Sequence, residues 1–450
     1  MKKTLIIAGA TGFIGRWIIE KFKDDYNLIA LTRNRISNKT SSNVIWREVD
    51  LYSISSTQNA LSGGDYAIYL VHSMQPSTRL NQGKFEDTDL LLADNFSRAA
   101  EKKRLKQIIY LGGIIPKDRK ILSKHLFSRL EVEKTLGSRA TPLTSIRAGI
   151  IIGPGGSSFQ IIKNLIINLP IMACPKWTKS LNQPIDVFDI LSVIRACIGN
   201  KEFIDRKIEV GGNKVLSYMD LLKLTSKLMN KKRVIFSIPF FTLGLSKLWV
   251  SLFTGSNLNF VSPLVESLKH KMIPEINSSI NKLIKTDIVE SIRNAISNKI
   301  PVLPNFDFIQ KEKNNVRSVQ RIYNPSLKSV LWIANEYPIW IKKKFIGIIK
   351  ARFDGEYLKF SIFSINLLEL KLIEDRSNLE RQLYYITGGF LVKRRDYGWL
   401  EFRSILDGKY IIVAIHEYVP KLPWILYKYF QALAHIYVMK SFENYLSKLK

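Results

Sequence analysis

One short stretch near the start of the chain constrains its fold more than any other. Residues 5–8 form a continuous apolar run, as a strand buried on both faces requires. A turn with three glycines follows, Gly9-Ala10-Thr11-Gly12-Phe13-Ile14-Gly15, and apolar residues at helical spacing come after it. Gly9 permits a tight turn, Gly12 lets backbone approach a pyrophosphate, and Gly15 lets helix pack close to strand. The stretch predicts a dinucleotide site at a helix N-terminus, with an ordinary strand–turn–helix as the alternative.

The region after this turn alternates expected strands and helices without a hairpin signal. The strands are expected at 27–32, 44–49, 66–71, 107–111 and 142–152, and the helices at 53–61, 85–103 and 123–136. Such alternation predicts an α/β fold with a doubly wound parallel sheet, whose ligands bind beyond the carboxyl ends of the strands. We therefore expect these residues to contact a cofactor: Gly9, Ala10, Thr11, Gly12, Phe13, Ile14, Gly15, Arg33, Arg35, Asp50, Leu51, Val71, His72, Ser73, Leu111 and Gly112.

Two arginines after the second expected strand bear on the choice of nicotinamide cofactor. In sites for NAD, an acidic residue about 20 residues past the glycines binds the ribose 2′-hydroxyl. This chain instead has Arg33-Asn34-Arg35. A carboxylate repels a 2′-phosphate, whereas a guanidinium can bind it through two hydrogen bonds. The pair favours NADP(H) over NAD(H), and a solvated basic loop is the alternative.

Further motifs accompany the glycine turn along the chain, at 69–74, 110–113, 125–133, 147–153 and 170–172. Together they resemble bacterial atypical members of the short-chain dehydrogenase/reductase superfamily, an extended-type NAD(P)-binding Rossmann family, that carry an appended C-terminal domain of unknown function. The resemblance implies an NAD(P)-dependent oxidoreductase and places Asp50 opposite the adenine. It says little about the substrate.

The catalytic pair of active superfamily members is absent. Those members use a Tyr as general acid/base and a Lys four residues later, on one helix face. The equivalent helix here carries His125 and Arg129, and Gly112-Gly113 replaces the usual Ser. One hypothesis is that His125 relays protons while Arg129 binds a phosphate or ribose. His72 can serve instead, or neither histidine is catalytic and the domain binds NADPH without turnover.

The expected N-terminal domain spans residues 1–305. Its second half, about 157–300, is expected to form an extension on the substrate side. Its apolar stretches at 234–255 and 260–270 can wall a pocket for a hydrophobic substrate, or form simple core. The polar interruptions in 234–255 favour a buried or interfacial segment over a spanning helix. Two prolines and a charged, Asn-rich run then predict a linker at 306–320.

The pattern changes in the C-terminal part, 321–450. Candidate strands occur in series at 357–365, 367–374, 382–393, 398–406 and 410–418, with Asp-Gly hairpin signals at 354–355 and 407–408 and a long apolar helix at 424–446. They predict a smaller α+β domain with an antiparallel sheet, which resembles the helix-grip, START-like ligand-binding architecture. Five aromatic residues either line an apolar cavity there or form plain core: Trp399, Phe402, Trp424, Tyr427 and Phe430.

Length and charge set the remaining expectations. At 450 residues the chain is too long for one core. Its net charge of +30 fits anionic partners, with compositional drift in a chain rich in Lys, Ile and Asn as the alternative. The chain has no dense basic block with interleaved aromatics, so we expect no nucleic acid. We expect a hydrophobic small-molecule substrate. Weak association of region 332–350 with an anionic membrane surface is the alternative to a soluble protein. Cys174 and Cys197 have no metal-ligand spacing, which predicts a reducing compartment and no metal site.

The sequence therefore predicts a cytoplasmic protein, and peripheral attachment to the inner membrane face is the alternative location. Its predicted function is NADPH-dependent reduction or epimerase-like chemistry on a hydrophobic small molecule. The alternatives are a catalytically inactive NADPH-binding sensor or regulator, and a peripheral membrane or complex subunit. The oligomeric state stays open.

Overall fold

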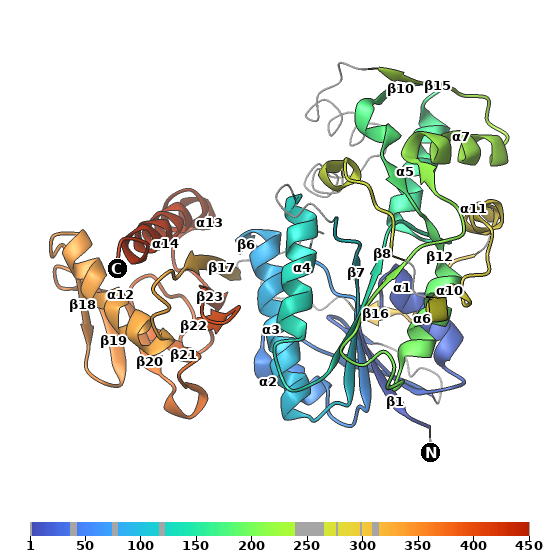
Figure 1. Ribbon diagram of the computed structural model, residues 1–450. Helices are drawn as coiled ribbons and strands as arrows, with labels where there is room; N and C mark the ends of the chain where they lie inside the picture. Colours follow the sequence, from blue (N-terminus) through green and yellow to red (C-terminus); the bar gives the residue numbers. More distant parts are fainter. Residues whose placement is uncertain are drawn as a thin grey trace. The chain divides into compact units, whose positions relative to one another are not determined.

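The chain divides into two compact units (Figure 1). The computed structural model describes residues 2–36, 43–73, 80–116, 122–238, 265–275, 278–297, 299–307 and 315–449. Unit 1 comprises residues 1–75 and 95–308, and unit 2 comprises residues 76–94 and 309–450. The sequence predicted one continuous N-terminal domain, 1–305, and gave no sign that residues 76–94 belong with the C-terminal part.

The core of unit 1 is a seven-stranded parallel sheet. Its strands, in the order β13-β8-β7-β5-β1-β2-β4, are Lys207–Val210, Leu143–Ala148, Gln107–Gly113, Tyr66–Tyr69, Thr4–Ala8, Asn27–Thr32 and Val44–Glu48. Every adjacent pair runs parallel. The strand order reverses between β1 and β5, which is the place where open α/β sheets bind their ligands. The predicted doubly wound sheet is confirmed.

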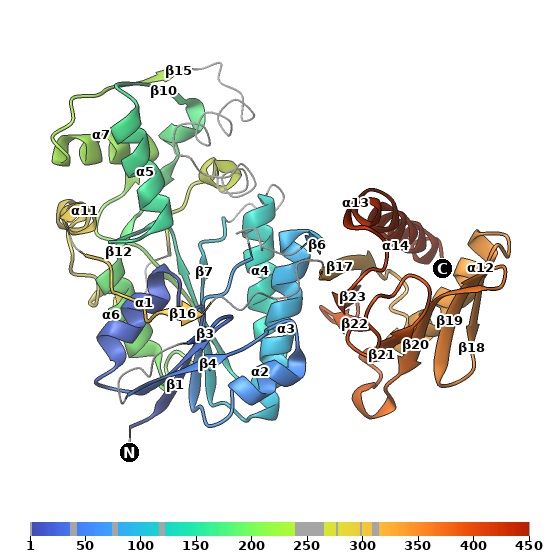
Figure 2. The same ribbon diagram turned by 180° about the vertical axis from the view of Figure 1, so that it is seen from behind.

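Helices cover both faces of this sheet (Figures 1 and 2). α1 (Phe13–Phe22) and α6 (Val187–Cys197) lie on one face, and α4 (Lys124–Leu136) lies on the other. α2 (Ile54–Ala60) connects β4 to β5, and α3 (Phe85–Lys102) precedes β7. Leu5 and Ile7 of β1 share one buried cluster with three residues of α1: Trp17, Ile18 and Phe22. The apolar run and the helical spacing seen in the sequence therefore build the same core.

The second half of unit 1 packs three helices around small strand pairs. α5 (Ser157–Asn168), α7 (Tyr218–Leu228) and α11 (Ile288–Ser297) share an apolar cluster, and the four-residue α10 (Ser278–Asn281) precedes α11. The strand pairs are β10 (Ile171–Pro175) with β15 (Val234–Ile238), β11 (Leu181–Asn182) with β14 (Leu216–Ser217), β9 (Ile151–Ile152) with β12 (Ile185–Asp186), and β3 (Arg35–Ile36) with β16 (Phe306–Asp307). Of the predicted apolar stretches, residues 239–264 lie outside the described residues.

Unit 2 is built on an antiparallel sheet in the order β18-β19-β20-β21-β22-β23-β17, with β6 added in parallel beside β17. In chain order these strands are β6 (Leu80–Gln82), β17 (Val316–Tyr323), β18 (Ile349–Phe353), β19 (Tyr357–Ile362), β20 (Ile365–Leu372), β21 (Arg381–Gly388), β22 (Trp399–Ile405) and β23 (Tyr410–Tyr418). Both Asp-Gly signals form the hairpin turns that the sequence predicted, since Gly355 and Gly408 have φ of +99° and +79°. The predicted α+β class of this part is confirmed.

Two helical segments pack on this sheet. α12 (Val330–Lys344) carries Tyr337 and Trp340, whose ring centroids each lie 5.0 Å from that of Phe442 in α14 (Ala432–Leu446). α13 (Trp424–Leu426) and a π-helical turn at Tyr427–Gln431 precede α14, so the predicted helix at 424–446 is present as one continuous helical segment.

Two features of unit 2 differ from the sequence prediction. The predicted linker, 306–320, overlaps β17, which begins at Val316, because Val316, Val319 and Ile322 are buried in the sheet. α12 was not predicted, since Pro338 stands inside it. Among the aromatics proposed for a cavity, Phe402 and Tyr427 belong to the packed core, whereas Phe430 is 67% exposed and lines no interior space.

A buried ion cluster lies on one face of the unit 2 sheet. The fully buried Arg403 places Nη1 2.9 Å from Oδ2 of Asp94 and Nη2 2.8 Å from Oε2 of Glu401. Arg381 Nε lies 2.7 Å from the same Glu401 oxygen, and His416 Nε2 lies 3.2 Å from the other. Burial alone would raise the pKa of Glu401, but the Arg403 and Arg381 guanidiniums hold it well below its usual range. Asp94 belongs to the segment 76–94, so this cluster ties that segment to the sheet.

Replacing Arg403 with Met should lower the free energy of unfolding by about 3–5 kcal/mol, because it removes the cation paired with the buried Asp94 carboxylate and one of the two guanidiniums paired with Glu401. Chemical denaturation of the full chain measures the change. Lys359→Met is the matched control, since it removes an exposed cation 3.5 Å from Glu369 and should cost about 1 kcal/mol or less. Equal stability of the two variants would contradict the structural role of the cluster.

Candidate functional site

The glycine turn after β1 forms a compact backbone cradle. Gly9 has φ of +89°, and a Cβ added there would lie 3.0 Å from the Cβ of Leu70. The Gly12 N–H donates to the Gly9 carbonyl at 3.0 Å. A Cβ added to Gly15 would clash with the Gly9 carbonyl oxygen and lie 2.7 Å from the Ala10 Cα. The positive φ of Gly9 and the close approaches at both glycines fit the structural roles assigned to Gly9 and Gly15.

The N-terminus of α1 is open toward this cradle. Its N-cap, Gly12, supplies no side-chain hydrogen bond, and its first turn holds no acidic residue. Arg16, one turn in, donates from Nε to the Thr11 carbonyl at 2.9 Å, which holds a guanidinium beside the turn. Uncapped N–H groups, the positive end of the helix dipole and a nearby cation all favour a bound phosphate. Arg16 is a candidate phosphate contact that the sequence did not single out.

The parallel register brings the other predicted cofactor residues to the same edge of the sheet as the glycine turn. Arg33 is exposed at the end of β2, and Val71, His72 and Ser73 follow β5 at half-buried positions. Leu111 and Gly112 lie within β7, where a Cβ on Gly112 would meet the Tyr110 ring at 2.8 Å. The backbone of Arg35 forms β3, and its side chain lies outside the described part of the structure.

The loop that carries Asp50 and Leu51 is fixed by short polar contacts. A carboxylate oxygen of Asp50 accepts from the Tyr52 N–H at 3.2 Å, and the Asp50 N–H donates to Ser56 Oγ at 3.0 Å. Asn95 of α3 donates to the Leu51 and Tyr52 carbonyls at 2.8 and 3.0 Å. The sequence did not identify Asn95, because its partners lie on a distant loop.

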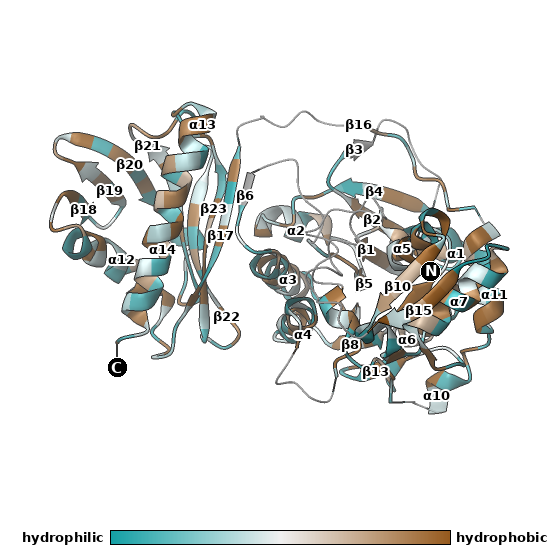
Figure 3. Cartoon of the chain, turned by 90° about the horizontal axis from the view of Figure 1, so that it is seen from above, coloured by the Kyte–Doolittle hydropathy of each residue, from teal (hydrophilic) through white to brown (hydrophobic). Residues whose placement is uncertain are grey.

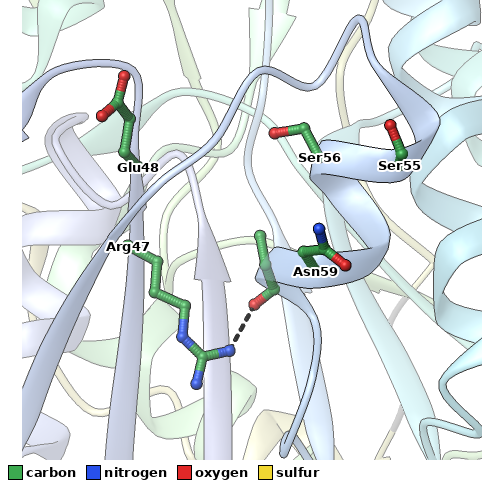
Figure 4. A pocket seen from close by; sticks show the side chains of 6 residues that line it. Arg47, Glu48, Ser55, Ser56 and Asn59 are labelled. Carbon is green, nitrogen blue, oxygen red and sulfur yellow. Dashed lines mark hydrogen bonds between the residues drawn. The ribbon is translucent and has the colours of Figure 1, made fainter.

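A shallow hollow lies beside this loop, between β4 and α2 (Figure 4). Its lining residues are Arg47, Glu48, Ser55, Ser56, Asn59 and Ala60. Arg47 Nη1 donates to the Ala60 and Ser62 carbonyls at 2.9 and 2.6 Å, so its guanidinium ties β4 to the end of α2. No residue that the sequence assigned to catalysis lines this hollow.

Two of the three catalytic candidates lie together. The ring centroids of His72, after β5, and His125, in α4, are 5.3 Å apart. His125 Nδ1 lies 3.2 Å from Ser267 Oγ, which is also 2.8 Å from Oγ of Ser123, the N-cap of α4. Burial, with the positive charges of Arg129 and His72, lowers the pKa of His125 well below its usual range. His125 is therefore a neutral imidazole at about pH 7.

The third candidate, Arg129, lies one helical turn after His125 and is half-buried. The helix that carries both residues is anchored to β8 by Glu133, which binds Arg147 through two hydrogen bonds of 2.7 and 2.8 Å and accepts from Ser145 at 2.6 Å. Ser267 lies 142 positions from His125, so no local pattern could have revealed their contact.

The cysteines take no part in this arrangement. Both thiols are free and buried, and burial raises the pKa of Cys174 to about 11 and that of Cys197 to about 12. Within the described residues, no group of His, Cys, Asp and Glu side chains could hold a metal ion. In the same residues no helix is both long and apolar enough to cross a membrane.

Comparison with known sequences agrees with the cradle. Residues 5–128 match the NAD dependent epimerase/dehydratase family. A curated relative, the auxiliary protein GraX of Staphylococcus aureus, is 30% identical over 114 residues, which are 25% of this chain and 37% of the relative. The matched region thus spans little more than a third of that relative's length.

Solved structures share the fold of unit 1. A nucleoside-diphosphate-sugar epimerase from Staphylococcus aureus has a TM-score of 0.51 at 15% identity, over 65% of this chain and 99% of that chain. The Citrobacter sp. triphenylmethane reductase complexed with NADP(H) has a TM-score of 0.50 at 16% identity, over 65% and 100%. An NADPH-dependent quinone oxidoreductase from Escherichia coli, complexed with NADPH, has a TM-score of 0.50 at 16% identity, over 64% and 98%. These matches establish the Rossmann-type fold.

Replacing Gly15 with Ala should weaken binding of a nicotinamide dinucleotide at least about tenfold and lower the free energy of unfolding by about 1–3 kcal/mol, because the new methyl group forces α1 away from the turn. Isothermal titration and chemical denaturation measure the two effects. Gly388→Ala is the control, since the nearest atom to its Cβ, Arg395 Nε, is 3.9 Å away. Unchanged affinity in Gly15→Ala would show that the cradle is not the cofactor site.

Proposed function

We propose that unit 1 binds NADP(H) and uses it in reduction or epimerase-like chemistry on a hydrophobic small molecule. The observation that carries this proposal is the glycine cradle at the open N-terminus of α1. It sits where the strand order of the sheet reverses, and residues 5–128 match an NAD-dependent family. Two proteins of the same fold are complexes with NADP(H) or NADPH, which supports the choice of cofactor.

The preference for NADP(H) rests on Arg33. Its side chain is exposed at the carboxyl end of β2, and the Asn34 N–H donates to Thr32 Oγ1 at 3.2 Å, which shapes the turn there. An exposed guanidinium at this place can bind a 2′-phosphate through two hydrogen bonds, and no carboxylate stands in the run 33–35 to repel it.

The chemistry rests on His125. A bound nicotinamide supplies or accepts a hydride, and the protein must then stabilise charge on the substrate. When the Nδ1 of a neutral His125 accepts from Ser267, its Nε2 carries the proton and can donate to a substrate oxygen. Arg129, one turn away, adds a fixed positive charge that stabilises a developing oxyanion. These two residues take the place of the usual Tyr and Lys.

A second candidate function is an NADP(H)-binding sensor or regulator without turnover. It is favoured by the same histidine, because a half-buried, neutral imidazole of lowered pKa is a poor proton donor at neutral pH. The curated relative that matches 114 residues of this chain is named an auxiliary protein. That name also supports a regulatory role.

For unit 2 we propose a helix-grip, START-like domain that helps to hold an apolar ligand. Support comes from its strand order, because β18 to β23 form an antiparallel meander and β17 pairs with its last strand, β23. Helices also follow both β17 and β23, as this architecture requires. The rings of Tyr337, Trp340, Phe402 and Phe442 pack against one another between α12, β22 and α14.

Oxidation of protein-bound NADPH with a panel of quinones, enones and lipid aldehydes separates the two candidate functions. An enzyme should oxidise NADPH with at least one acceptor, and His125→Gln should lower that rate about 10²-fold or more without changing NADPH affinity. Ser192→Ala, which removes an exposed hydroxyl bonded to the Phe188 carbonyl, is the control. Tight NADPH binding without turnover by any acceptor would favour the sensor.

Arg33→Asp should weaken binding of NADPH about tenfold or more and leave NADH affinity nearly unchanged, because the new carboxylate repels only the cofactor with a 2′-phosphate. Fluorescence titration with both cofactors measures this difference. Arg206→Asp, in the turn before β13, provides a control with the same change of charge. Equal losses for both cofactors would remove Arg33 from the 2′-phosphate site.

A further inference from the structure

The helical segment formed by α13, the π turn and α14 exposes an unusual number of large apolar side chains. We call this set the apolar face: Ile425, Leu426, Tyr429, Phe430, Leu433, Ile436 and Tyr437, which are between 37% and 70% exposed. The opposite side of the segment contributes Tyr427, Ala432, Met439 and Phe442 to the core of unit 2. Figure 3 shows hydrophobic residues on α13 and at intervals along α14. A segment that is apolar on both sides marks an interaction surface.

The surroundings of the apolar face are basic. Residues 420–440 include Lys421, Lys428 and Lys440 and contain no Asp or Glu. The backbone N–H of Lys421 donates to the Leu391 carbonyl at 2.9 Å, which ties the start of the segment to the loop after β21. That loop exposes Phe390, whose ring lies 5.2 Å below Lys421 Nζ. It also exposes three consecutive basic residues and one acid: Lys393, Arg394, Arg395 and Asp396.

We propose that the apolar face docks on the surface of an anionic lipid bilayer, with the helical segment lying in the plane of the interface. Interfacial helices combine an apolar face, which enters the boundary between headgroups and acyl chains, with Lys and Arg that bind anionic headgroups. Tyr429 and Tyr437 have the amphipathic rings that are enriched at this depth. The inference does not rest on the proposed cofactor function, because it concerns unit 2 alone.

The charge pattern argues against two other occupants of this face. A second copy of the chain would bring the lysines of both copies together around one interface, and like charges oppose such pairing. An acidic protein would satisfy the lysines, but seven exposed large apolar side chains fit the acyl-chain boundary better. The sequence predicted membrane contact at 332–350, whereas the exposed apolar face lies at 425–437.

Sedimentation of the full-length protein with vesicles tests this proposal. We expect binding to phosphatidylglycerol–phosphatidylcholine vesicles at low salt, weaker binding at high salt, and little binding to pure phosphatidylcholine. The double variant Tyr429→Ser/Phe430→Ser should reduce binding to the anionic vesicles at least about tenfold. Leu379→Ser is the control, since Leu379 is 74% exposed in the turn before β21, outside the apolar face.

A charge variant tests the basic surroundings separately. Lys421→Glu/Lys428→Glu should weaken binding to the anionic vesicles more than about tenfold, because each lysine near such a surface contributes roughly a fivefold gain. Lys201→Glu/Lys227→Glu, at exposed positions of unit 1, changes the net charge equally and should bind as the unchanged protein does. Circular dichroism of every variant checks that the fold is kept.

Three results would overturn the proposal. The first is no binding to anionic vesicles at low salt, and the second is equal binding by the Tyr429→Ser/Phe430→Ser variant and the unchanged protein. The third is a dimer in solution, measured by light scattering without lipid, that the same variant dissociates, since the face would then join two copies of the chain.

Discussion

The close approach of α1 to the end of β1 is the constraint on which unit 1 depends. It requires the absence of a side chain at Gly15, where a methyl group would overlap the Gly9 carbonyl oxygen. Because α1 can approach so closely, Trp17, Ile18 and Phe22 reach the buried cluster on the sheet, and the uncapped helix N-terminus points to the switch point between β1 and β5. One packing requirement thus serves both the core and the cofactor cradle.

Unit 2 depends on a different kind of interaction. Its sheet buries Arg381, Glu401, Arg403 and His416 in one network, and Asp94 completes the network from a segment that precedes β17 by more than two hundred positions. Such a network is stable only when every charge has its partner. Asn95, the next residue in α3, belongs to unit 1, where it donates to the Leu51 and Tyr52 carbonyls.

The candidate site combines a well-formed cradle with an unusual set of polar residues. His125 and Arg129 have the spacing of the usual catalytic pair, and α4 is held to β8 by the Glu133–Arg147 ion pair. His125 is neutral, hydrogen-bonded to Ser267, and close to His72. A neutral imidazole can position and polarise a substrate oxygen but donates a proton poorly.

The sequence by itself determined the α/β class, the glycine cradle, the hairpins at Gly355 and Gly408, and the terminal helical segment, because apolar period and turn chemistry are local properties. It missed α12, in which Pro338 obscures the helical pattern, and it extended the linker into β17. Only the tertiary structure decided that residues 76–94 belong to unit 2, that Ser267 meets His125, and that Phe430 faces outward rather than into a cavity. These outcomes depend on contacts between residues far apart in the chain, and on which side of a helix meets the core, and no local pattern records either.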